Sequence, residues 1–167
     1  EYVRGIVESS SLPPAIIPAL IFVIAAFLSF SMGTAWGTFG ILIPIIVPVC
    51  SAIAPQLIIV SLSATLAGSV FGDHCSPISD TTILSSTGSQ CNHLKHVGTQ
   101  IPYAVIVAVC CAIGYVVAGV TNGLGQAAST GIALVVAIVI LTVILLIAPK
   151  VWKYTPEQQE IINSVED

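Results

Sequence analysis

The chain has 167 residues, of which 56% are hydrophobic and only 7% are charged, and its mean hydropathy is +1.03. A soluble domain typically has about 25% charged residues, so this composition excludes a soluble domain. The lack of a basic patch excludes a nucleic-acid-binding protein. Positions 9 to 149 contain only three charged residues, which are Asp73, Asp80 and Lys95. The sequence therefore predicts an all-α polytopic membrane protein.

The first hydrophobic region runs from Leu12 to Cys50 and has a small, polar stretch in its middle, from Ser29 to Gly40. It is either two full spans joined by a turn or two half-length helices that meet inside the membrane. We favour the second reading, a re-entrant hairpin, because an exposed turn usually contains Asp or Asn and this stretch has neither. Gly33 and Gly37 are expected at its tip.

The second region, residues 56–90, is too long for one straight span of about 20 residues. Pro77 cannot continue a helix, but it suits the first position of a new one, with Ser76 as the N-cap. The sequence therefore predicts a broken helix, whose first half ends near Gly72 and whose second half begins at Pro77. Ala64, Gly68 and Gly72 recur at four-residue spacing, which is typical of close helix packing in membranes.

The last two regions, Ile101 to Val120 and Ile132 to Ala148, are uninterrupted apolar spans that we interpret as scaffold. If Lys150 and Lys153 are cytoplasmic, Lys95 also lies inside, as the positive-inside rule expects, whereas Arg4 lies outside.

The chain is divided into two parts by these patterns. Residues 1–153 are predicted to form a transmembrane domain, the C-terminal half of a longer transporter, because the chain does not open with Met. Residues 154–167 are predicted to form a cytoplasmic amphipathic tail. The expected location is the cell membrane, with a cytoplasmic C-terminus.

Asp73 and Asp80 are the leading candidates for a functional site, because an ionised carboxylate in a bilayer is costly. Hydroxyls cluster around them, hard cations such as Na⁺ take oxygen ligands, and secondary transporters place ion sites at broken helices. At Asp80 the helix dipole favours the anion and burial favours the neutral acid, which suits alternation between H⁺ and a cation. The supporting oxygen donors or spacers are Thr34, Thr38, His74, Ser76, Ser79 and Thr81, and the predicted helix breaks involve Gly33, Gly37, Gly72 and Pro77.

Two other interpretations of these residues stay open, a purely structural role and a metal site. Each aspartate can simply cap a half-helix. Asp73, His74 and Cys75 could form a soft-metal site of a membrane metalloenzyme, and Cys91, His93 and His96 have a spacing seen in zinc sites. We rank these below a transport site, and we expect no enzyme, no cofactor and no metal beyond the transported cation.

The stretches from Ser31 to Thr38 and from Gly72 to Thr82 resemble the signature segments in the second half of NhaC-type sodium/proton antiporters. The resemblance implies an inverted-repeat transporter in which each half gives a re-entrant hairpin and a broken helix to one central site. This chain would be the second inverted repeat. Ala35 departs from the pattern, since members commonly have Ser there. Relatives also exchange organic acids or amino acids.

The sequence thus predicts a secondary active transporter that exchanges Na⁺ for H⁺ through a mid-membrane carboxylate site. The alternative is a cation-coupled exchanger of small organic acids or amino acids. The expected partners are Na⁺ and H⁺, the lipid bilayer and the N-terminal half of the same transporter, and a homodimer is left open.

Overall fold

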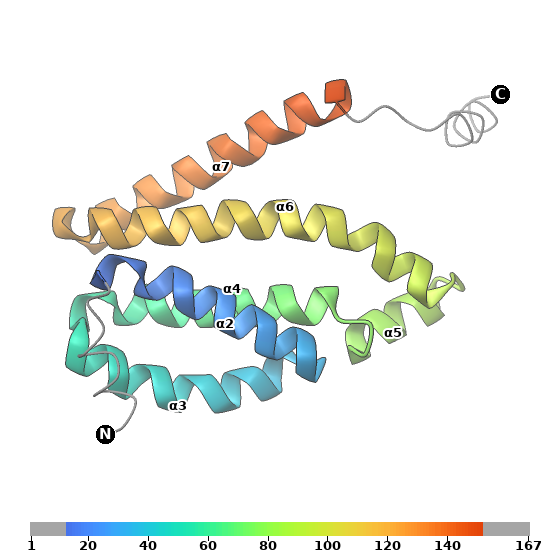
Figure 1. Ribbon diagram of the computed structural model, residues 1–167, viewed down its shortest axis with the longest axis horizontal. Coiled ribbons are helices and arrows are strands. Elements are labelled where there is room, and N and C mark those ends of the chain that lie inside the picture. The colour runs from blue at the N-terminus through green and yellow to red at the C-terminus, as the bar shows by residue number, and fades with distance from the viewer. Residues whose placement is uncertain (1–12, 152–167) are drawn as a thin grey trace.

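A computed structural model of the chain describes residues 13–151, and the side chains of residues 13–147. The predicted tail at 154–167 and Arg4 lie outside the described residues. Within them, five helical segments are long and apolar enough to cross a membrane. Figure 1 shows them as a stack in which α3, the pair α2 and α4, then α6 and α7 follow one another.

The first region folds as a tight helical hairpin. The 3-10 turn η1 (Pro14–Ile16) leads into α2 (Ile17–Met32), and α3 (Ala35–Ile53) returns beside it. Gly33 ends α2 in the left-handed conformation, with φ 67°, a conformation that glycine adopts without steric cost. Each arm has 19 residues, or about 28 Å of helix, and can cross a membrane by length and composition. The hairpin is therefore present, and its re-entrant placement stays a prediction.

The second region is a broken helix, as predicted, but its break lies later than expected. After η2 (Pro55–Leu57), α4 (Ile58–Cys75) continues three residues past Gly72, and α5 (Asp80–Gly88) begins at Asp80. The predicted helix start at Pro77 with Ser76 as its N-cap is therefore wrong. Ser76 is extended at ψ 127°, as expected before a proline, but Pro77 and Ile78 form only a turn, because Ser79 is extended again at ψ 133°. The chain then turns, with the Ser79 N–H donating to the Ser76 carbonyl at 3.3 Å, and Ser79 becomes the N-cap residue.

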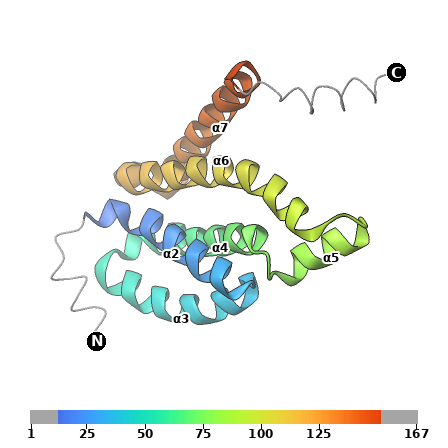
Figure 2. The same ribbon diagram turned by 45° about the vertical axis from the view of Figure 1, so that its right-hand side comes forward.

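The two remaining spans are present and longer than their apolar cores. α6 (His93–Val120) begins before the predicted Ile101, with Asn92 as its N-cap, and η3 (Thr121–Leu124) connects it to α7 (Gln126–Val151). α6 contains Pro102 and bends in its first part (Figure 2), as an internal proline favours. α7 packs on α6 near their connection and then diverges from the other helices.

Small residues bring α2 and α4 into close contact. A Cβ on Gly68 would collide with the Phe22 carbonyl oxygen, and one on Gly72 would collide with that of Ala26. The Ser29 hydroxyl also donates to the Ser69 carbonyl at 2.6 Å. The packing role predicted for the small-residue spacing is confirmed. Gly72 is consequently a contact residue inside α4, and its assignment to the helix break is wrong.

Candidate functional site

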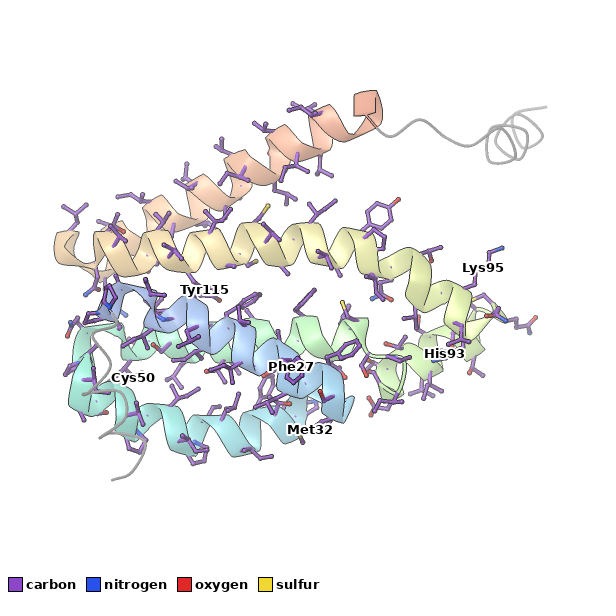
Figure 3. The ribbon with its side chains drawn as sticks, viewed as in Figure 1. Phe27, Met32, Cys50, His93, Lys95 and Tyr115 are labelled. Carbon is purple, nitrogen blue, oxygen red and sulfur yellow. The ribbon has the colours of Figure 1, made fainter. Side chains whose placement is uncertain are left out.

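The hairpin tip meets the helix break. A Cβ on Gly33 would lie 2.8 Å from Ile78 Cγ1 and 2.9 Å from the Ile78 carbonyl oxygen. Figure 3 places Met32, the last residue of α2, at the end of the hairpin that faces α5. The two signature segments, far apart in the sequence, therefore form one structural unit. Gly37 packs inside the hairpin instead, close to Thr34 and Met32.

Asp73 is buried at this junction, with 8% of its surface exposed. Its Oδ2 accepts from the Thr81 hydroxyl at 3.4 Å, and the Thr81 and Ser79 hydroxyls are 2.8 Å apart. Its Oδ1 is buried and has no hydrogen-bond partner among the described residues. A buried carboxylate with an unpartnered oxygen is costly unless a proton or a cation neutralises it. The cluster of Asp73, Ser79 and Thr81 spans the break and can hold either.

Asp80 has a different environment. It is the first residue of α5, its side chain is exposed within this chain, and its Oδ1 accepts from the Thr81 N–H at 2.7 Å. The helix dipole favours a negative charge there. The burial that was expected to oppose this charge is not found within the described residues, so the two aspartates differ in their surroundings.

The Thr34 and Thr38 hydroxyls of the hairpin form hydrogen bonds within the hairpin itself. Thr34 caps α3 by accepting from the Gly37 N–H at 3.4 Å, and the buried Thr38 hydroxyl donates to the Thr34 carbonyl at 2.9 Å. Ser76 is buried in the break and accepts from the Ile78 N–H at 3.4 Å. The structure therefore brings Ser76, but not Thr38, into the break.

His74 points away from the carboxylate cluster. It is exposed and lines an apolar groove between α4 and α6, together with Gln100 and Tyr103. Successive helical residues project in different directions, so Asp73, His74 and Cys75 do not converge. Among the described residues, no group of three His, Cys, Asp or Glu side chains is placed to hold a metal ion.

His93 is a site-supporting residue whose role the sequence reading missed. Its Nε2 lies 2.7 Å from the Pro77 carbonyl oxygen, and its Nδ1 lies 2.9 Å from the Ser86 hydroxyl. It therefore connects the start of α6 to the break and to α5, as its position in Figure 3 shows. In the sequence it stood in a polar loop with zinc-like spacing, and no local pattern reveals a partner 16 residues away.

These features define the class of protein. Five apolar helices, with a buried carboxylate beside a helix break, make this chain part of a multi-pass membrane protein. Residues 1–120 match the model of the Na⁺/H⁺ antiporter family, and the chain belongs to this family. Membership points to a transporter rather than to an enzyme.

Two of the relatives that this chain matches are named as antiporters, and a third is an uncharacterized protein. An uncharacterized protein of Haemophilus influenzae is 50% identical over 139 residues, which is 83% of this chain and 27% of that protein. The malate-2H⁺/Na⁺-lactate antiporter of Bacillus subtilis is 32% identical over 66% of this chain and 23% of its own length. The arginine/ornithine antiporter of Halobacterium salinarum is 36% identical over 61% of this chain and 22% of its own length. This chain thus spans about a quarter of each relative's length, and no solved structure matches it.

Proposed function

We propose that the full-length protein is a secondary active transporter of the NhaC type that exchanges Na⁺ for H⁺, with Asp73 as the carboxylate that binds both. The observation that carries the proposal is the buried, unpartnered Oδ1 of Asp73 at a helix break. In an apolar surrounding, an ionised carboxylate needs a counter-charge, and a neutral one needs a proton. Family membership supports the cation-coupled exchange.

Competition at one carboxylate gives the exchange mechanism. When Asp73 is ionised, Na⁺ is held by its oxygens, with the Thr81 and Ser79 hydroxyls beside it as hard oxygen donors. When Asp73 is protonated, the positive charge is no longer needed, and Na⁺ leaves. Only a neutralised site crosses between the two access states at low cost, so each transport cycle moves one kind of ion in each direction.

Asp80 has a second role in this proposal. It is exposed at the N-terminus of α5, one residue before Thr81. We place it at the mouth of the site, where its charge attracts the cation without burying it. The remaining ligands come from the N-terminal half of the transporter, which would contribute an inverted copy of the hairpin and the broken helix.

The arrangement of elements supports a re-entrant hairpin. The tip at Gly33 reaches the break, whereas α5 and the first part of α6 extend beyond it in Figure 1. α4, the break and α5 together run alongside the 28-residue α6. A hairpin that stops at the break of a longer spanning unit is the geometry expected when its arms end inside the bilayer.

An organic substrate is the alternative, favoured by relatives named for malate, lactate, arginine and ornithine exchange. A substrate carboxylate would bind best at a cationic side chain or a free helix N-terminus. Here the start of α5 is occupied by Asp80, and Lys95 is the one Lys or Arg among residues 13–147. These features of the described residues favour a cation over an organic anion.

Transport by the full-length protein in everted membrane vesicles tests the proposal. With a pH gradient established and followed by a fluorescent dye, addition of Na⁺ should collapse the gradient, whereas malate, lactate, arginine or ornithine without Na⁺ should not. The proposal would be overturned if Na⁺ had no effect. Gradient collapse that requires an organic substrate would support the alternative.

A further inference from the structure

A line of buried oxygen atoms runs along α4 and ends at Asp73. Ser61, Thr65, Ser69 and Asp73 follow one another at four-residue intervals, which places them on one side of the helix. They are all the buried side chains of α4 that carry an oxygen, and the three hydroxyl residues are fully buried. The rise of an α-helix makes the line about 18 Å long. We call these four residues the oxygen stripe.

The hydrogen bonds of the oxygen stripe leave its hydroxyl oxygens free to accept. The Thr65 hydroxyl donates to the Ser61 carbonyl at 2.9 Å, and the Ser69 hydroxyl donates to the Thr65 carbonyl at 2.7 Å. A hydroxyl has one proton to give, so both oxygens can only accept from a further partner. The stripe therefore suits a hard cation, or a water molecule that donates to it, and disfavours an anion.

Helix packing alone does not explain the oxygen stripe. Ser and Thr in membrane helices often bond the carbonyl four residues before them, and this accounts for Thr65 and Ser69. It does not account for Ser61, whose Oγ is buried and has no hydrogen-bond partner among the described residues. The one other such side-chain atom among them is Asp73 Oδ1, at the opposite end of the stripe. An unpartnered buried oxygen costs free energy unless a ligand completes it, so both ends of the stripe call for one.

We propose that the oxygen stripe is the route by which cations reach Asp73 from the end of α4 where α3 joins it. This inference rests on the proposed function, because it gives the proposed ion site a second entrance. Ser61 lies in the first turn of α4, whereas Asp80 lies past the last turn. Figure 1 shows the α3–α4 connection and α5 at opposite ends of this helix. The mouth at Asp80 and the stripe thus approach Asp73 from opposite sides, as alternating access requires.

The route along the oxygen stripe is closed in this structure. Ser61, Thr65 and Ser69 are fully buried, so no solvent contacts them. α2 lies directly against α4 here, and the Ser29 hydroxyl donates to the Ser69 carbonyl at 2.6 Å. Opening therefore needs the hairpin and α4 to move apart, which is the kind of rigid-body movement that alternating access uses.

Silver ions test the route without any transported Na⁺. In a cysteine-free full-length protein in vesicles and chloride-free buffer, Ser61→Cys, Thr65→Cys and Ser69→Cys should react with Ag⁺ added from the side on which Gln56→Cys reacts. Loss of later alkylation, after denaturation, measures the reaction.

The matched control for silver labelling is Val60→Cys, the neighbour of Ser61. Val60 is also buried, but it packs on apolar residues of α6 and α7. We expect the thiols of the oxygen stripe to react roughly tenfold faster than this control, because exposure governs thiol reactivity. Equal rates, or reaction only from the opposite side, would overturn the proposal.

Thr65→Val gives a second test that needs no cysteine. It removes an acceptor oxygen and keeps the shape of the side chain, so Na⁺/H⁺ exchange should slow roughly fivefold. The rise in Tm that Na⁺ binding should cause is retained, because Asp73 is intact. Thr142→Val is the matched control and should leave both unchanged, since the Thr142 hydroxyl donates to the Ile138 carbonyl at 2.8 Å in the same way but is exposed on α7. An unchanged rate in Thr65→Val, or loss of the rise in Tm, would overturn the route.

The route and the proposed function fail separately in these experiments. Silver labelling along the oxygen stripe in a protein that does not exchange Na⁺ for H⁺ would remove the proposed function and support a route for cations to Asp73. Exchange by a protein whose stripe thiols react no faster than Val60→Cys would remove the route alone.

Discussion

Asp73 and Asp80 look alike in the sequence, and packing separates them. Both are acids inside a long apolar stretch, seven positions apart on either side of Pro77. Asp73 is buried because it lies on the face of α4 that α2 covers. Asp80 is exposed because α5 begins at this residue. Since α5 begins only at Asp80, after Ser79 returns to extended backbone, the sequence could predict the pair of aspartates but not which carboxylate is buried.

Sodium should stabilise the protein through Asp73. A ligand that binds only the folded state adds about 2.7 kcal/mol when its concentration is 100 times its dissociation constant. We expect Na⁺, relative to choline at equal ionic strength, to raise the Tm of purified full-length protein. Asp73→Asn should abolish this rise, because the buried negative charge that would bind Na⁺ is lost and an amide NH₂ replaces one carboxylate oxygen.

The matched control is Asp80→Asn, which removes an equal charge from an exposed position. It should retain the Na⁺-dependent rise in Tm. An undiminished rise in Asp73→Asn would show that Na⁺ binds elsewhere.

At the scale of elements, the contact of the hairpin with the broken helix organises the first part of the described chain. Small residues let α2 lie directly on α4, and the tip of the hairpin then reaches Ile78 in the break. The four-residue spacing of Ala64, Gly68 and Gly72 was sufficient to predict a packing surface. It could not show that its partner is α2, because that depends on the fold of the whole region.

Gly72→Ala should destabilise the protein by about 1 to 3 kcal/mol, the usual cost of overpacking. Its new Cβ would collide with the Ala26 backbone, which cannot move without displacing α2. Thermal unfolding of the full-length protein measures this as a lower Tm. Gly98→Ala, on α6 with open space around it, is the control and should leave the Tm unchanged or slightly raised.

Gly33→Ala should impair transport more than folding. Its φ of 67° costs about 1 to 2 kcal/mol for a residue with a Cβ, and that Cβ would press on Ile78 in the break. We expect Na⁺/H⁺ exchange in vesicles to fall roughly tenfold at equal expression, given about 1.4 kcal/mol per factor of ten. Gly40→Ala has open space and serves as control; equal rates for the two variants would contradict the importance of the tip.

At the scale of the whole molecule, much of the apolar surface of the described residues has no partner within this chain. α7 contacts α6 only near their connection, and its apolar residues remain exposed along most of its length. The chain also covers only about a quarter of each relative's length. The sequence could therefore predict the membrane-spanning helices and a candidate site, but not the complete set of ligands. Contacts from the rest of the transporter leave no pattern in these residues.

Labelling of single cysteines in a cysteine-free full-length protein tests the re-entrant placement. Gln56→Cys and Ala127→Cys should react with a membrane-impermeant thiol reagent from one side, and Leu94→Cys from the other; all three positions are exposed. Met32→Cys, at the hairpin tip, should react much more slowly than Leu94→Cys. Equal reactivity from the Leu94 side would show that the hairpin arms cross the membrane completely.

The central claim is that Asp73 carries both ions, and Na⁺-driven proton movement in proteoliposomes tests it most directly. Asp73→Asn should lower the exchange rate at least about 100-fold, a transition-state difference of about 3 kcal/mol. Asp80→Asn should raise the KM for Na⁺ and leave the maximal rate within about threefold, because it lies at the mouth of the site. Exchange by Asp73→Asn at the wild-type rate would contradict the account.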